Sequence, residues 1–168
     1  MSRGFVKESD QEELPIIPPR ADLPPGLINY VTECGYDELL AERDKMIYER
    51  DNLFISDENE SRITVNFINA KLQLLLNRIS TAKIVKLEKQ PKNTVRFGAE
   101  VFFAVDSDPE IQNYQIVGVD EANIAKRKIA FNSPIAKIFL DRKAGDSVTL
   151  KLGKTEKQFK IVSIKYRQ

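Results

Sequence analysis

The sequence predicts an α+β protein in which an antiparallel helical hairpin, a coiled coil, precedes an antiparallel sheet with one helix across its face. Three observations predict this class: a cluster of prolines near the start, two stretches of helical periodicity joined by a polar turn, and short β-branched segments after Pro91. They divide the chain into an extended proline-rich arm (1–30), a helical hairpin (31–84) and a sheet domain (85–168).

The arm is predicted from its prolines. Five of the eight prolines of the chain fall between positions 15 and 25. A segment interrupted so often cannot run as a helix or pair as a central strand. Two alternatives stay open for the arm: it is disordered, or it lies on a partner as a polyproline-type strip led by Ile16, Ile17 and Leu23.

The hairpin is predicted from two apolar stripes. Thr32 is the expected N-cap of a first helix over 33–55, and a polar break at 56–60 separates it from a second helix. The stripes are Tyr36, Leu39, Leu40, Met46, Ile47, Leu53 and Phe54 in the first helix, and Ile63, Phe67, Ile68, Leu72, Leu75, Leu76, Ile79 and Ala82 in the second. Because the rest of the chain has another pattern, we expect a projecting coiled coil rather than a helical core.

The sheet is predicted from short segments rich in β-branched and aromatic residues. They cover 94–105, 114–119, 129–131, 147–152 and 158–166, and 153–156 is a hairpin connection between the last two. One helix interrupts them, with Ser133 as N-cap and Pro134 at its first position. We expect it to have two to three turns and to end at Ala144-Gly145-Asp146.

The composition excludes most self-contained catalysis. The chain has no histidine, which removes Ser-His-Asp and Cys-His catalysis and imidazole zinc sites. Cys34 is the only cysteine, so no internal disulfide can form, and a reducing compartment is expected. No run approaches the ~20 apolar residues of a membrane span. We therefore expect a cytoplasmic monomer, no membrane partner, no cofactor bound alone and no enzymatic activity of its own.

The charge is divided unevenly along the chain. The net charge of +1 is the sum of −2 for residues 1–30, −3 for 31–84 and +6 for 85–168. This division indicates parts that face different regions of a large charged partner. The run Ala125-Lys126-Arg127-Lys128, next to Asp120-Glu121, is either a phosphate contact or a solvated loop. Gly98 is interpreted as structural, at a bulge or a close approach.

An acidic cluster marks the turn of the hairpin. Asp57, Glu58 and Glu60 stand where the second helix begins. In a structural interpretation, Asp57 caps this helix, Glu60 completes a capping box, and all three favour the positive end of the helix dipole. In a functional interpretation, the end of a rod delivers carboxylates into the site of another macromolecule, where two oxygen ligands can hold Mg²⁺.

The second half of the chain resembles the C-terminal domain of the Gre family of bacterial transcription elongation factors. Three segments carry the resemblance in order and spacing: YQIVGVDEA (114–122), IAFNSPIA (129–136) and KAGD (143–146). Tyr30-Val31-Thr32, followed by Gly35 and a leucine-bearing helix, is similar to the start of that family. The resemblance covers 30–168 and leaves the arm outside it.

The resemblance implies an FKBP-like sheet domain that docks at the rim of the secondary channel of bacterial RNA polymerase, with the coiled coil inside the channel. It implies polymerase-docking residues Ser133, Pro134, Ile135 and Lys137, and tip residues Glu58, Asp57 and Glu60 that reach the catalytic Mg²⁺ of the polymerase. The polymerase would cleave backtracked RNA itself, and the factor would contact nucleic acid only indirectly, through the elongation complex.

Two departures from the family favour an alternative. Ile55 stands three residues before Glu58, where cleavage factors have an aspartate, and the first helix is short, ~34 Å for 33–55. These features point to a channel-binding regulator without cleavage activity, as Rnk-like and inhibitory homologues are. An FKBP-like fold also suggests a peptidyl-prolyl isomerase, although fold says little about function. An isomerisation assay on a test peptide separates that class from the others.

Overall fold

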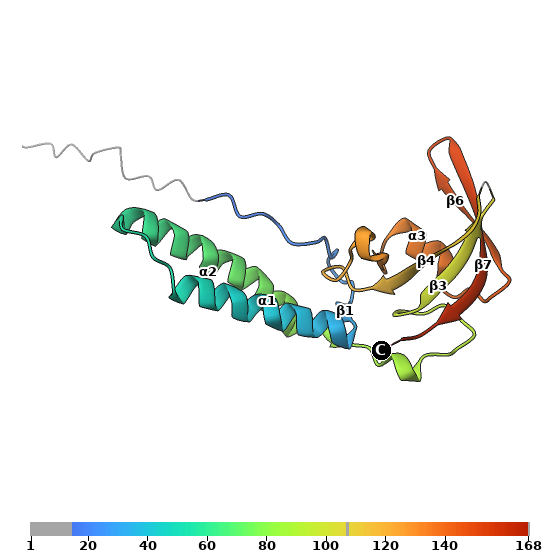
Figure 1. Ribbon diagram of the computed structural model, residues 1–168, viewed down its shortest axis with the longest axis horizontal. Coiled ribbons are helices and arrows are strands. Elements are labelled where there is room, and N and C mark those ends of the chain that lie inside the picture. Colours follow the sequence, from blue (N-terminus) through green and yellow to red (C-terminus); the bar gives the residue numbers. More distant parts are fainter. Residues whose placement is uncertain (1–14, 107, 168) are drawn as a thin grey trace, which may run out of the picture.

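The computed structural model describes residues 15–106 and 108–167, and shows a helical rod attached to a sheet (Figure 1). The rod is an antiparallel pair of helices, α1 (Glu33–Asp51) and α2 (Glu58–Thr81), which extends away from the sheet. The predicted α+β class, with a projecting hairpin followed by a mostly antiparallel sheet and one helix, is confirmed. The three-part division of the chain remains a prediction.

Both ends of α1 are fixed by side chains. Thr32 is the N-cap, as predicted, and its Oγ1 accepts a hydrogen bond of 2.9 Å from the Gly35 amide. The predicted end at residue 55 is wrong. The Asn52 amide and side chain both donate to the Tyr48 carbonyl and so close the helix four residues earlier. The 19 residues of α1 therefore span about 28 Å, less than expected from the sequence.

The hairpin is held by a narrow apolar seam. Leu39 of α1 and Leu72 and Leu75 of α2 are buried, whereas three members of the predicted stripes, Phe54, Ile63 and Leu76, are exposed. A pair of helices has one contact line, so it cannot cover the wider stripe that a globular core would cover. At the base, β1 (Tyr30–Val31) pairs in parallel with β2 (Lys83–Ile84) and brings the start and the end of the hairpin together.

Within the described residues, five strands form the main sheet in the order β5-β4-β3-β7-β6. Their bounds are β3 (Glu100–Val105), β4 (Asp108–Val117), β5 (Lys128–Ala130), β6 (Ser147–Leu152) and β7 (Thr155–Lys165). The sheet is antiparallel, as expected, except at one edge, where β4 and β5 run parallel. Residues 118–127, which include the short 3-10 turn η2 (Ile124–Lys126), cross over between them and allow this direction.

Several element ends differ from the sequence prediction for local reasons. Strand β3 begins at Glu100 rather than at 94, because Gly98 has a φ of 85° that no extended strand adopts. Helix α3 (Pro134–Phe139) has six residues and stops before Asp141, whose φ is 66°, so the predicted end at 144–146 is wrong. Another 3-10 turn, η1 (Leu87–Lys89), follows β2, and the Leu87 side chain occupies the space where a Cβ on Gly98 would lie.

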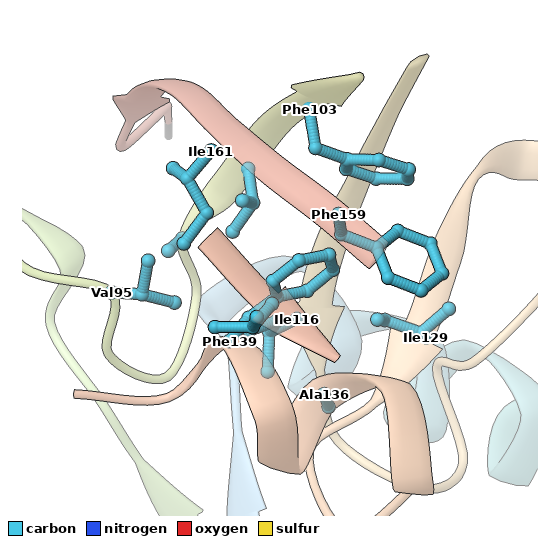
Figure 2. Packing of buried hydrophobic residues seen from close by; sticks show 11 residues of the cluster. Val95, Phe103, Ile116, Ile129, Ala136, Phe139, Phe159 and Ile161 are labelled. Carbon is cyan, nitrogen blue, oxygen red and sulfur yellow. The ribbon is translucent and has the colours of Figure 1, made fainter. Parts of the chain in front are cut away.

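The core lies between the sheet and α3, as Figure 2 shows. Phe103 of β3, Phe159 of β7 and Phe139 of α3 gather at its centre. The Phe139 ring centroid lies 5.1 Å from that of Phe103 and 5.8 Å from that of Phe159. These aromatic contacts hold the short helix α3 on the sheet.

Residues 15–29 have neither helix nor strand, as the prolines predict. This part of the arm is hydrogen-bonded to helix α2 of the same chain, at the base of the hairpin. The Ala21 carbonyl accepts a hydrogen bond of 2.6 Å from Arg78 of α2, and the buried Asn29 side chain donates to the Arg78 carbonyl over 2.8 Å. The remainder of the predicted arm, 1–14, lies outside the described residues.

Candidate functional site

The acidic cluster occupies the free end of the rod. Asp57, Glu58 and Glu60 are all exposed, at the start of α2 and far from the sheet (Figure 1). Asp57 is the N-cap of α2, as predicted, and accepts a hydrogen bond of 2.7 Å from the Glu60 amide. The reciprocal capping-box bond expected from Glu60 does not form among the described residues, because its carboxylate stays in solvent. One carboxylate oxygen of Asp57 is already engaged, by the bond from the Glu60 amide.

This tip presents oxygen ligands but no complete metal cage. No group of three or more Asp, Glu, Cys or His residues in 15–106 and 108–167 has the geometry to hold a metal ion. Two carboxylates at the start of a helix can complete the coordination of a Mg²⁺ whose other ligands come from a second molecule. Phe54, which is 96% exposed, stands beside them. The tip can therefore contribute to a site in a partner rather than form one itself.

The predicted docking residues lie at α3, near the sheet and away from the tip. Ser133 is the N-cap of α3 and accepts a bond of 3.3 Å from the Ala136 amide, and Pro134 is the first helical residue. Pro134 and Lys137 are exposed. Ile135 is half-buried and packs against the sheet core, so its substitution would test folding as well as docking.

A further set of residues, which the sequence did not single out as a site, joins the rod to the sheet. Glu121 is buried, and its carboxylate accepts hydrogen bonds of 2.6 Å from Thr32 and 2.8 Å from Lys128. Burial alone would lower the pKa of Lys128, but the hydrogen bond and the charge of Glu121 hold it above its ordinary value. Of the cationic run, Lys128 thus belongs to this joint, whereas Lys126 and Arg127 are exposed.

The chain segments at this joint are so closely packed that two glycines, Gly118 and Gly35, have no room for a Cβ. A Cβ added to Gly118 would lie 2.6 Å from the Tyr30 carbonyl oxygen, and one added to Gly35 would overlap the Glu121 carboxylate. In the sequence, the only sign of this joint is the acidic pair Asp120-Glu121 next to the cationic run 126–128. A pairing between Glu121 and Thr32, which are 89 positions apart, leaves no local pattern.

The fold and these surfaces define a protein of two joined parts, a sheet and a helical rod that carries acidic side chains on its free end. No helix in the part of the chain that the structure describes is long and apolar enough to cross a membrane.

Comparison with known proteins identifies the family. The family model described as "Transcription elongation factor, GreA/GreB, C-term" matches residues 90–166. The chain is 31% identical to transcription elongation factor GreA of Trichlorobacter lovleyi over 81% of its own length and 96% of that protein. It is 38% identical to GreA of Geobacillus kaustophilus over 59% of its own length, and the match spans 63% of that relative.

Two solved structures are also similar to the chain. GreA factor homolog 1 of Thermus thermophilus is 21% identical, and the match covers 81% of this chain and 97% of that protein with a TM-score of 0.39. A GreA/GreB factor of Nitrosomonas europaea is 19% identical, and the match covers 82% of this chain and 98% of that protein with a TM-score of 0.41. Because the match covers 96% of the Trichlorobacter relative at 31% identity, the chain belongs to the GreA/GreB family of transcription elongation factors.

Proposed function

We propose that this protein binds bacterial RNA polymerase at its secondary channel and modulates backtracked elongation complexes. The sheet part docks at the channel rim through the surface of α3 formed by Ser133, Pro134 and Lys137, with Ile135 beneath it. The rod enters the channel and brings Glu58, Asp57 and Glu60 toward the catalytic Mg²⁺ of the polymerase. The polymerase performs any RNA cleavage, and this protein needs no bound cofactor of its own.

One observation carries this proposal: three exposed carboxylates stand together on the free end of a rod that projects from a separate sheet. Helix capping explains Asp57, which bonds to the Glu60 amide, but it does not require Glu58. A carboxylate cluster without a surrounding site is useful when the rest of the site belongs to a partner.

The test of the tip is RNA cleavage by stalled, backtracked polymerase with the wild-type protein and with Glu58→Gln. We expect Glu58→Gln to abolish stimulated cleavage, because a neutral amide is a far poorer Mg²⁺ ligand than a carboxylate. Stability should fall by no more than ~0.3–1 kcal/mol, the size of a helix-dipole interaction. Affinity for the polymerase should be unchanged. Asp57→Asn should reduce cleavage less than Glu58→Gln, because one oxygen of Asp57 is already engaged in capping α2. It should leave stability nearly unchanged, since Asn caps nearly as well as Asp.

A matched control is Glu49→Gln, which removes one exposed carboxylate from the last turn of α1, outside the acidic cluster. It should leave both cleavage and binding at wild-type levels. If Glu58→Gln and Glu49→Gln behave alike while the wild-type protein stimulates cleavage, the role of the tip is refuted.

A second candidate, a channel-binding regulator without cleavage activity, is favoured by three observations. Ile55 stands where the partner carboxylate of the family belongs, and Asp57 is engaged in capping α2. With α1 of only about 28 Å, the rod is also short. A wild-type protein that binds polymerase, stimulates no cleavage over a range of Mg²⁺ concentrations, and competes with a cleavage-active Gre factor would establish this candidate instead.

The docking surface is tested by Lys137→Glu. Lys137 is exposed on α3, so the change should leave the fold intact and weaken polymerase binding roughly 10-fold by reversing one charge at the interface. Binding is measured by fluorescence anisotropy at low and at physiological salt. Lys154→Glu, in the exposed turn between β6 and β7, is the control for a change of net charge. Equal loss of affinity in both variants would contradict docking through α3.

A further inference from the structure

Four charged side chains from four separate segments meet where the arm reaches the base of the hairpin. Arg20 of the arm donates to both oxygens of Glu42 on α1, over 2.8 and 2.9 Å. Its Nε also donates to Oδ1 of Asp120, in the turn after β4, over 2.9 Å. One guanidinium therefore joins the rod to the sheet.

Arg78 of α2 completes the cluster from the other side. Its Nε lies 3.0 Å from Oδ2 of Asp120, and its Nη2 donates to the Ala21 carbonyl of the arm. Asp120 thus stands between two arginines, one from the arm and one from the rod. Two arginines and two carboxylates give the cluster no net charge.

Three of the four side chains are shielded from solvent, whereas the Glu42 side chain is 38% exposed. The side chains of Asp120, Arg78 and Arg20 are only 8%, 13% and 17% exposed. The hydrogen bonds that Arg20 donates to Glu42, together with the charge of Asp120, raise the pKa of Arg20 above its ordinary value despite its burial. The planar arginine fork suits a carboxylate on two sides, which a lysine ammonium does not reproduce.

The residues on either side of Arg20 in the arm restrain it in this position. Pro18 and Pro19 precede it directly and fix their own φ angles, which lowers the conformational entropy lost when the arm is ordered. On the other side, the Ala21 carbonyl and the Asn29 side chain are both bonded to Arg78. Arg20 is therefore restrained by the prolines that precede it and by the hydrogen bonds of the residues that follow it.

A small change of angle at this base is amplified at the tip. Over the 19 residues of α1, at ~1.5 Å each, a tilt of about 10° moves the tip by roughly 5 Å. Displacement of a reacting group by ~1 Å can cost on the order of 100-fold in rate. The Glu121 joint restrains the rod at Thr32, and the Arg20 cluster restrains it at a second place, Glu42, further along α1.

We propose that Arg20 is a positioning residue: by binding Glu42 and Asp120 together, it makes the arm a strap that holds the hairpin at a fixed angle to the sheet. The consequence for the polymerase rests on the proposed function, in which the tip must arrive at one place. The fixed angle itself does not depend on it.

The test measures the angle without polymerase. Spin labels are placed at Ser56→Cys in the tip and at Thr149→Cys on β6, both exposed positions, in a Cys34→Ser background. We expect a single narrow distance distribution for this protein, and Arg20→Gln should at least double its width. The control is Arg43→Gln, which removes an arginine from an exposed pair with Asp44 on the same helix and should leave the distribution unchanged.

Circular dichroism must first show that Arg20→Gln is folded. If it is not, Arg20→Lys keeps the charge but cannot bind both carboxylates through a fork, and it should also broaden the distribution. A distribution for the folded Arg20 variant that matches that of Arg43→Gln overturns the proposal.

The polymerase assay separates this proposal from the proposed function. If the wild-type protein acts on backtracked complexes, Arg20→Gln should weaken that effect roughly 10-fold or more, and Arg43→Gln should not. A broadened distribution with an unchanged effect on the polymerase overturns the functional role of the strap. If the wild-type protein has no effect on polymerase, the proposed function fails and the distance measurement alone decides the strap.

Discussion

Gly35→Ala is expected to destabilise the protein by about 2–4 kcal/mol, although alanine is the better helix former. At an ordinary helical position the change would add roughly 1 kcal/mol of stability. Here the new Cβ would overlap the carboxylate of Glu121 and lie 3.0 Å from its Cδ. Glu121 would have to leave Thr32 and Lys128, and a buried carboxylate without partners costs more than the helix gains. Urea unfolding followed by circular dichroism measures the difference.

The matched experiment repeats Gly35→Ala in a Glu121→Ala background. With the carboxylate gone, the nearest remaining atom is the Cβ of residue 121, at 3.3 Å, and a shift of a few tenths of an ångström accommodates it. The same change should now stabilise by up to roughly 1 kcal/mol. This reversal of sign distinguishes the joint from a general intolerance of α1. Stabilisation by Gly35→Ala in the wild-type background would mean that Glu121 does not occupy this space.

Phe139→Ala is expected to have the largest effect, a loss of about 3–5 kcal/mol in the free energy of unfolding. The Phe139 side chain is fully buried and contacts the rings of Phe103 and Phe159. Its removal leaves a cavity under a helix of six residues, which has little stability of its own. Thermal unfolding should show a lower midpoint for the sheet.

Phe54→Ala is the control for this substitution, because it removes the same side chain from a site that is 96% exposed. It should change stability by less than ~0.5 kcal/mol. Equal losses in the two variants would contradict the core shown in Figure 2.

Local signals were sufficient for most elements. The N-caps Thr32, Asp57 and Ser133 were each recognised from a small polar residue before a helical pattern, because capping depends on an amide two or three residues away. Strand β6 has the predicted bounds, since an alternating stretch ends at Gly153. The acidic tip was also predictable, as it follows from the position of a turn between two helices.

The sequence pattern does not predict features that depend on a contact between distant residues or on a single backbone angle. Phe54 continues the helical pattern of α1, but Asn52 ends the helix before it. The sequence predicts an antiparallel sheet and gives no sign that the crossover of 118–127 returns the chain parallel to β4. Ile135, expected at the docking surface, is half-buried against the sheet core, and its part in docking stays a prediction.

By itself, the sequence determined the α+β class, the helical caps, the carboxylates at the end of the rod and the absence of histidine chemistry, because each depends on residue type and short spacing. Only the tertiary structure decided how the rod is fixed to the sheet. Arg20 and Asp120 are 100 positions apart, and Thr32 and Glu121 are 89 apart. Polar and charged side chains so distant in the sequence become partners only when packing brings them together and removes the water that would otherwise solvate them.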